Sequence, residues 1–170
     1  MLTDAYYYKL CNAVATESRC LSRQIGAILV KDGMVVSHGN NSPPEGVPSC
    51  SFRYANDKNL IEKLKDVKNI NTSICPRRAL NFPSGEGLEW CVAIHAEKNC
   101  LINLTKLKLR IDISNSTLYL NTTITPCSQC FGSLINAGIT EIVCLDIYPY
   151  DISVPWLIDN SKIKLRKFEL

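Results

Sequence analysis

The sequence lacks an apolar run that could cross a membrane, since a membrane-spanning helix needs about 20 predominantly apolar residues. Its first residues also lack the basic and apolar blocks of a signal peptide. The net charge of +3 is small, and the basic residues are scattered except for an alternating run at 162–167. That alternation is typical of a solvated strand face. We therefore expect a cytoplasmic protein that binds neither membranes nor nucleic acids.

Internal repeats and low-complexity tracts are also missing. With 170 residues and 46% hydrophobic content, the sequence predicts a single domain at 1–170 that buries a full core. The nine cysteines are the unusual part of the composition. In a reducing compartment such cysteines favour metal ligands or buried thiols over disulfides.

Two short motifs carry the candidate chemistry. Residues 95–97 read His-Ala-Glu, and residues 126–130 read Pro-Cys-Ser-Gln-Cys. One imidazole and two thiolates, from His95, Cys127 and Cys130, make three zinc ligands and leave the fourth tetrahedral position open for water, as in catalytic zinc sites. Glu97 is then free to move protons. The pattern predicts a zinc hydrolase.

Local signals place both motifs at helix starts. Thr125 suits an N-cap and Pro126 suits the first helical position, so Cys127 and Cys130 are expected on the first turn of a helix that ends before Gly138. The positive end of that helix lowers the pKa of a thiol and favours the thiolate.

A second helix is expected to start at His95. It would place Glu97 on an apolar inner face with Cys100, Leu101 and Leu104. A carboxylate on such a face is costly unless it has a partner, which indicates a functional or strongly bonded role for Glu97.

Each motif alone has a plainer interpretation. A lone Cys-x-x-Cys could be a redox pair or half of a structural zinc site, and a lone His-x-Glu means little. Together they match the zinc-deaminase signature, His-x-Glu followed by Pro-Cys-x-x-Cys.

The remaining chain predicts strands that alternate with helices. A helix should open at Thr3 or Asp4, and Lys31-Asp32-Gly33 should turn a hairpin between strands at 24–30 and 34–37. Further strands are expected at 117–120, 141–145 and 162–168. This order predicts an α/β protein with α/β/α layers around a mixed sheet, and zinc between two facing helix starts. A proline- and glycine-rich insert at about 42–92, with a polar helical piece at 59–68, is too long for an idle loop.

Several segments resemble the deoxycytidylate (dCMP) deaminases of the cytidine deaminase superfamily. The residues at 18–20, 24–33 and 39–46 resemble the opening of these enzymes. Cys-Pro-Arg-Arg at 75–78 and Ser-Gly-Glu-Gly-Leu-Glu-Trp-Cys at 84–91 resemble the insert of microbial and viral members. The resemblance covers nearly the whole chain. It implies the three-layer α/β/α cytidine-deaminase-like fold with a mixed five-stranded sheet, and a homo-oligomer, as in hexameric relatives.

The resemblance implies zinc-dependent hydrolytic deamination of dCMP to dUMP, the precursor for dTMP synthesis. Zinc on His95, Cys127 and Cys130 would supply hydroxide to C4 of the base. Glu97 would carry the proton to ring N3 and then toward the departing ammonia.

The resemblance also implies how the small-molecule nucleotide is held. Asn41 would bind the sugar and Tyr148 would lie beside the nucleotide, although a loop asparagine is ordinarily a turn residue. Because the family substrate is a monophosphate, Arg23 and Lys98 are candidates for binding phosphate. Both are residues that more often serve as surface charges.

A second, structural zinc is also expected. Its ligands would be the four thiols that lie in or near the insert: Cys20, Cys50, Cys75 and Cys91. Such a site would hold an insert too polar and proline-broken to fold on its own core, and some relatives hold a structural zinc in this region. The spacings are irregular, and the alternative is that these cysteines are small buried hydrophobic residues.

Two departures from the family and two other functions remain open. Gly-Asn-Asn-Ser at 39–42 replaces the Gly-Tyr-Asn-Gly of members regulated by dCTP and dTTP, and Lys106 stands where an arginine is common. The chain could instead be another superfamily deaminase, acting on cytidine, deoxycytidine or tRNA. It could also be a zinc-stabilised binding module, which would need neither Glu97 on an inner face nor an open coordination position.

Overall fold

The computed structural model describes residues 3–83, 85–106 and 111–170. Ser84, the first residue of the insert segment at 84–91, therefore lies outside the described residues. The helices are α1 (Asp4–Ala15), α2 (Cys50–Asn56), α3 (Lys58–Leu64), α4 (Pro76–Ala79), the 3-10 turn η1 (Leu88–Trp90), α5 (Ala96–Lys106), α6 (Ser128–Asn136) and α7 (Val154–Asp159). The strands are β1 (Gly26–Lys31), β2 (Met34–Asn40), β3 (Thr117–Leu120), β4 (Glu141–Cys144) and β5 (Lys164–Lys167).

The strands form a mixed five-stranded sheet in the order β2-β1-β3-β4-β5. β1 is antiparallel to both β2 and β3, whereas β3, β4 and β5 run parallel to one another. The parallel half requires crossover connections, and α6 and α7 supply them. The predicted α/β fold class and mixed sheet are confirmed.

The hairpin between β1 and β2 is also confirmed. Asp32 and Gly33 both adopt positive φ, at 50° and 77°. Two consecutive residues with positive φ form the turn whose twist matches the flanking strands, and Asp-Gly is a preferred sequence for it. This turn pairs Lys31 with Met34 and so sets the register of the sheet edge that leads to residues 39–42.

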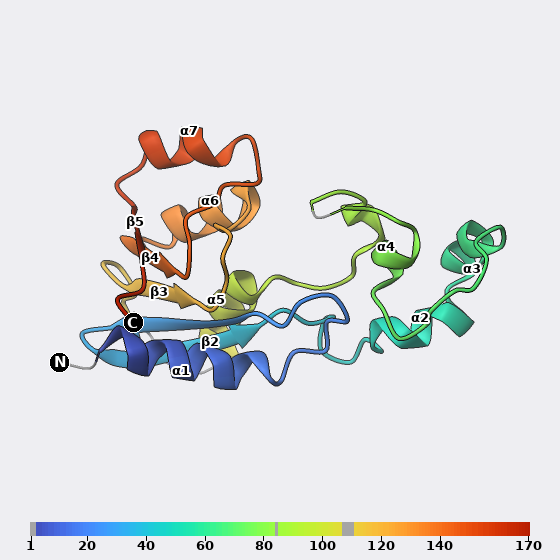
Figure 1. The fold of residues 1–170 in the computed structure, drawn as a ribbon. Helices are drawn as coiled ribbons and strands as arrows, with labels where there is room; N and C mark the ends of the chain where they lie inside the picture. Colours follow the sequence, from blue (N-terminus) through green and yellow to red (C-terminus); the bar gives the residue numbers. More distant parts are fainter. Residues whose placement is uncertain (1–2, 84, 107–110) are drawn as a thin grey trace.

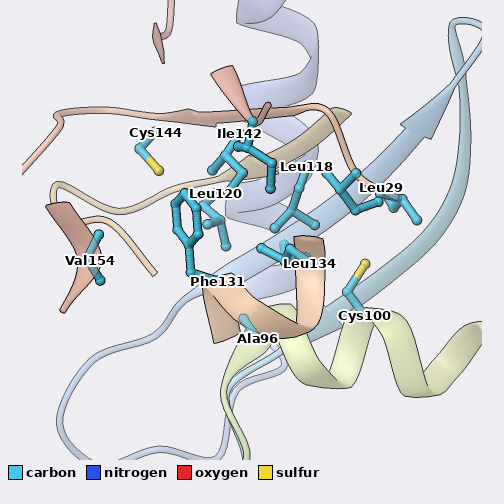
Figure 2. Close-up of a cluster of buried hydrophobic side chains, with 13 residues drawn as sticks. Leu29, Ala96, Cys100, Leu118, Leu120, Phe131, Leu134, Ile142, Cys144 and Val154 are labelled. Carbon is cyan, nitrogen blue, oxygen red and sulfur yellow. The ribbon is translucent and has the colours of Figure 1, made fainter. Parts of the chain in front are cut away.

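Helices cover both faces of the sheet, which gives three layers (Figure 1). On one face, α1 packs Tyr7 and Cys11 against Ile28 and Tyr119. On the other face, α5, α6 and α7 enclose the main core, in which Phe131 and Leu134 of α6 lie against the strands (Figure 2). Phe131 is fully buried, and burying a side chain of this kind contributes about 1.5–3 kcal/mol. The core thus fixes α6 on the sheet.

The insert extends from the sheet as an arm of short helices, α2 to α4 (Figure 1). It has a small apolar cluster of its own, because Leu60 and Leu64 on one face of α3 pack with Ala79 of α4. The insert, which the sequence predicts to be too polar and proline-broken to fold on its own core, thus still buries a few apolar side chains. Residues one helical turn apart in α3 share a face, and half-buried groups such as Trp90 complete the cluster.

None of the described helices combines the length and apolar character that crossing a membrane requires.

The end of β2 passes unusually close to the helix that begins after His95. A side-chain carbon added at Gly39 would lie 2.3 Å from the backbone nitrogen of Cys100 and 2.8 Å from the carbonyl oxygen of Ala96. Both atoms belong to the backbone of α5, which cannot rotate away as a side chain would. Glycine at this position therefore sets how closely α5 approaches the sheet.

We expect Gly39→Ala to destabilise the protein by about 2 kcal/mol or more, since overpacking a close contact costs about 1–3 kcal/mol or more. Urea denaturation measures the free energy of unfolding. The matched control is Gly132→Ala in α6, where an added Cβ meets nothing within 4 Å. That variant should gain about 0.5–1 kcal/mol from helix propensity. Equal effects of the two substitutions would contradict the close-packing explanation.

Candidate active site

Three potential metal ligands meet where α5 and α6 begin. The Nδ1 atom of His95 lies 3.6 Å from Sγ of Cys127 and 3.4 Å from Sγ of Cys130. All three ligand atoms lie within 4.8 Å of one another. A tetrahedral zinc with Zn–N and Zn–S bonds of about 2.1 and 2.3 Å would place its nitrogen and sulfur ligands about 3.6 Å apart. The donor set and its spacing therefore fit zinc with one coordination position left open.

The start of α6 differs from the sequence prediction. The helix begins at Ser128, and Cys127 is its N-cap residue, so Cys127 precedes the first turn and Cys130 lies within it. Thr125 does not cap the helix. Its backbone N–H instead donates to the carbonyl of Tyr148 at 3.1 Å.

The N-terminal partner of α6 comes from a distant loop. A carboxylate oxygen of Asp151 accepts from the backbone N–H of Ser128 at 2.8 Å. This bond satisfies one of the free donors of the helix end, and the negative charge suits the positive end of the helix. Hydrogen bonds from Ser128 hold the pKa of Asp151 below its usual range. The start of α6, and with it both cysteines, is thereby fixed.

The start of α5 is held by the loop that follows β2. Ser42 and Ile94 exchange two backbone hydrogen bonds, of 2.9 and 3.2 Å, and so place His95 at the next position. The Asn99 side chain donates to the carbonyl of Asn40 at 2.7 Å and joins the first turn of α5 to the end of β2. The imidazole therefore stands at a helix start that is bonded to the sheet edge.

The local electrostatics favour a metal-binding thiolate. Hydrogen bonds from the Cys130 thiol and the His95 ring hold the pKa of Cys127 at about 4, despite burial. The same pairing raises the pKa of Cys130, which keeps the shared proton. The hydrogen bond to Cys127 also raises the pKa of His95. The three groups thus hold protons among themselves that a bound cation would displace.

Glu97 lies beside these groups and is buried, with 8% of its surface exposed. Burial raises the pKa of its carboxyl above the usual range. Among the described residues, the only hydrogen-bond donor to this carboxylate is its own backbone N–H. A buried carboxylate with so little protein bonding is suited to exchange protons with a bound molecule.

These residues open into one cavity of about 820 Å³, its mouth included. His95, Glu97 and Cys127 line it together with residues of the strand ends and of the insert. Of the predicted substrate-binding residues, Arg23 and Asn41 line the cavity.

The structure does not place Tyr148 or Lys98 in the cavity lining. Tyr148 is 63% exposed, and its main contact with the site is through its backbone carbonyl. The tyrosine that lines the cavity is Tyr150, two residues later. Lys98 lies outside the lining, and its positive charge opposes part of the rise in the pKa values of His95 and Glu97.

Asn41 is buried, and its side chain is already largely engaged by the protein. Its Oδ1 atom accepts from the backbone N–H of Ile25 and from the Ser18 hydroxyl, both at 2.8 Å. Its Nδ2 atom donates to the carbonyl of Arg23 at 2.7 Å. One N–H of the amide remains available for a bound molecule. Asn41 therefore also fixes the entry to β1.

The four cysteines predicted for a second zinc gather in one region. Cys20, Cys75 and Cys91 line the cavity. Burial, and to a smaller extent the nearby Cys75, Cys91 and Cys20, raise the pKa of Cys50 to about 11. Among the described residues, only His95, Cys127 and Cys130 form a group of three or more such ligand atoms within 4.8 Å of one another. The structure brings the four thiols together without showing a formed metal site.

Sequence reasoning missed Asp151, Tyr150 and Arg77, which the structure places at or beside the site. The first two lie in an irregular loop, where local patterns do not indicate which side chains turn inward. Arg77 lies in the Cys-Pro-Arg-Arg segment, whose resemblance to the family insert indicated that this region is important. That segment did not distinguish Arg77 from the neighbouring Arg78.

The sequence is similar to known proteins that agree with this interpretation of the site. The family described as "Cytidine and deoxycytidylate deaminase zinc-binding region" matches residues 1–146. The deoxycytidylate deaminase of Mycobacterium phage D29 is 30% identical over 145 residues, which cover 82% of this chain and 91% of the phage protein. That of Schizosaccharomyces pombe is 26% identical over 165 residues, 97% of this chain. The chain spans only 44% of the length of the yeast protein.

The fold is also similar to a solved structure. The dCMP deaminase from cyanophage S-TIM5, in complex with dCMP and dUMP, superposes with a TM-score of 0.64 at 20% identity, over 96% of this chain and 95% of that chain. A likeness at this identity shows the fold, which confirms the predicted cytidine-deaminase-like architecture. The family match over residues 1–146 includes both motifs that supply the histidine and cysteine ligands. The chain therefore belongs to the cytidine and deoxycytidylate deaminase family of zinc-binding deaminases.

Proposed function

We propose that this protein hydrolytically deaminates dCMP to dUMP with the help of zinc, and so supplies the precursor for dTMP synthesis. The observation that carries the proposal is the convergence of His95 Nδ1 on two cysteine sulfurs, at 3.4 and 3.6 Å, beside a buried carboxylate in a cavity. The relatives named deoxycytidylate deaminase support the choice of substrate. The family resemblance further supports a single domain with an insert, a homo-oligomer such as a hexamer, and a cytoplasmic location.

The residues fit a zinc ion held by His95, Cys127 and Cys130. Zinc in such a site supplies Lewis-acid chemistry that makes water a nucleophile near neutral pH. The protein's own contribution is to fix the three donors at two helix starts and to keep Glu97 next to them without making it a ligand.

Glu97 is proposed to transfer the protons of the reaction. In the deamination, a C4–O bond forms, the C4–N bond breaks and ammonia leaves. Glu97 takes the proton of the attacking water, delivers it to ring N3 and later helps to protonate the departing amine. Because burial raises the pKa of Glu97, the carboxyl holds such a proton more readily than an exposed glutamate would.

The cavity suits a pyrimidine nucleotide. Arg23 contributes a cation to its lining and is proposed to meet the phosphate. The remaining N–H of Asn41 is proposed to donate to the sugar. Lys98, which lies outside the lining, is proposed to act as a longer-range positive charge. Tyr148 could contact the nucleotide only at the rim, so Tyr150 is the better candidate for the wall beside the base.

A second zinc, held by Cys20, Cys50, Cys75 and Cys91, remains part of the proposal. Its support is the gathering of the four thiols at the junction of the insert and the cavity. Four thiolates around one cation would tie the insert to the segment that leads into β1.

Glu97→Gln should keep zinc and lose deamination by at least about 10²- to 10⁴-fold, because the carboxylate is the acid–base group and not a ligand. Zinc content and the rate of dCMP deamination, measured on the same preparation, test this. Glu17→Gln makes the same substitution at an exposed position and should leave both unchanged. Loss of zinc together with activity would show that Glu97 has a different role.

The substrate can be identified by comparing kcat/KM for dCMP, CMP, deoxycytidine and tRNA. We expect dCMP to be the best substrate and to exceed deoxycytidine by about 10- to 100-fold, the value of a charged hydrogen bond to the phosphate. Equal turnover of deoxycytidine would replace the proposal with a nucleoside deaminase. Turnover of tRNA alone would replace it with an editing enzyme.

Metal analysis of the purified protein should give two zinc ions per chain, falling to one in Cys75→Ser. Cys11→Ala is the matched control, because Cys11 is a buried core thiol on α1 that faces β1, and it should leave two ions. A value of one zinc in the unmutated and fully active protein would rule out the second site while leaving the catalytic site in place.

A further inference from the structure

The insert places a second arginine in the candidate active-site cavity. Arg77 belongs to the short helix α4 and is only 7% exposed, yet it lines the same cavity as His95 and Glu97. Arginine is rarely buried unless it is paired with an anion. A buried guanidinium that faces an open cavity is therefore expected to pair with an anion.

The described residues do not supply this partner. The Nε atom of Arg77 is buried and has no hydrogen-bond partner among them. No carboxylate in the described part of the chain forms an ion pair with its guanidinium, and none of the nearby cysteine sulfurs accepts a hydrogen bond from Nε. Leaving a charged donor desolvated and unbonded is costly, so the position is suited to an anion that arrives with a ligand.

Arg77 lies toward the insert side of the cavity. Its charge acts on Cys91, which follows η1 of the insert. The charges that act on Glu97 come instead from His95, Cys127 and Lys98. A ligand that presents its base to Glu97 and an anionic group to Arg77 would span the cavity from one side to the other.

The chemistry of the guanidinium indicates the anion. Its planar fork of N–H donors matches the oxygens of phosphate or carboxylate, which a point charge such as lysine cannot reproduce. Among the described residues that line the cavity, Glu97 carries the only carboxylate, so few negative charges on the Arg77 side would repel an incoming phosphate.

We propose that Arg77 is a specificity-determining residue that binds the phosphate of the substrate nucleotide, so that the insert selects a nucleotide over a nucleoside. This inference rests on the proposed deamination of a pyrimidine nucleotide and adds to it the group that recognises the phosphate. Arg23 lines the same cavity, and the two guanidinium groups would share the phosphate.

The test compares kcat/KM for dCMP and for deoxycytidine in the zinc-loaded protein and in Arg77→Gln. We expect the substitution to lower the value for dCMP by about 10- to 100-fold, the effect of a lost charged hydrogen bond. The value for deoxycytidine, which has no phosphate, should change by less than about threefold, within the range of an altered neutral contact. Arg77→Lys keeps the charge without the fork and should fall between the two proteins for dCMP.

Arg78→Gln is the matched control. Arg78 is the next residue on α4, does not line the cavity and donates to the carbonyl of Phe82. The Arg78→Gln variant should prefer dCMP over deoxycytidine as strongly as the unmutated protein does. Zinc content and the thermal unfolding midpoint of each variant show whether the fold is retained.

A direct binding measurement separates this inference from the proposed reaction. Calorimetric titration with inorganic phosphate should show binding to the unmutated protein and to Arg78→Gln, and loss of that binding in Arg77→Gln. Equal losses of kcat/KM for dCMP and deoxycytidine, together with unchanged phosphate binding, would overturn the role of Arg77. If the unmutated protein failed to deaminate dCMP, the proposed function would fall, and the phosphate titration would still decide whether Arg77 binds the anion.

Discussion

The structure of the site depends on bringing one imidazole nitrogen to within 3.4 and 3.6 Å of two cysteine sulfurs, although His95 and Cys130 are 35 residues apart in the chain. Neither motif can hold the other by itself. The meeting is fixed by the sheet, because the loop after β2 bonds to Ile94 and the core side chain Phe131 seats α6 on the strands. The close contact of Gly39 with α5 and the bond from Ser128 to Asp151 then remove the remaining freedom. The main contribution of the fold to the site is therefore to position the starts of α5 and α6.

That convergence also sets the charges at the site. Three titratable ligands packed together cannot all keep their ordinary protonation, so the pKa of Cys127 falls to about 4 while that of Cys130 rises. Glu97 is buried beside them, and its pKa rises for a different reason, the loss of solvent. One neighbourhood thus holds both a thiolate prepared for a cation and a carboxyl prepared to hold a proton. Pairs of groups whose environments drive their pKa values apart are typical of acid–base sites.

The sequence predicted those parts of the structure that follow from local spacing. Asp32-Gly33 has one preferred turn, and the donors at 95, 127 and 130 share one chemistry, so the hairpin and the ligand set could both be predicted. The start of α6 could not, because Thr125 and Pro126 carry the usual start signals while the group that bonds Ser128 comes from Asp151, far along the chain. The choice between Tyr148 and Tyr150 was missed for a related reason. An irregular loop has no period that tells which side chain turns toward the cavity.

The insert shows why metal-binding residues can be predicted from the sequence more readily than residues that recognise the substrate. Zinc ligands need fixed donor types at short spacings, so they leave a motif that can be read. Phosphate recognition needs only a positive group at one side of the cavity, and Arg77 and Arg78 are identical in type and adjacent in sequence. Successive residues of a helix point about 100° apart, so α4 buries one arginine in the cavity and leaves the other partly in solvent. Only the burial of Arg77, and the absence of a partner for its Nε among the described residues, separates the two. Because the insert lies outside the sheet and its two facing helix starts, a change at its arginines could alter substrate choice without disturbing the metal ligands.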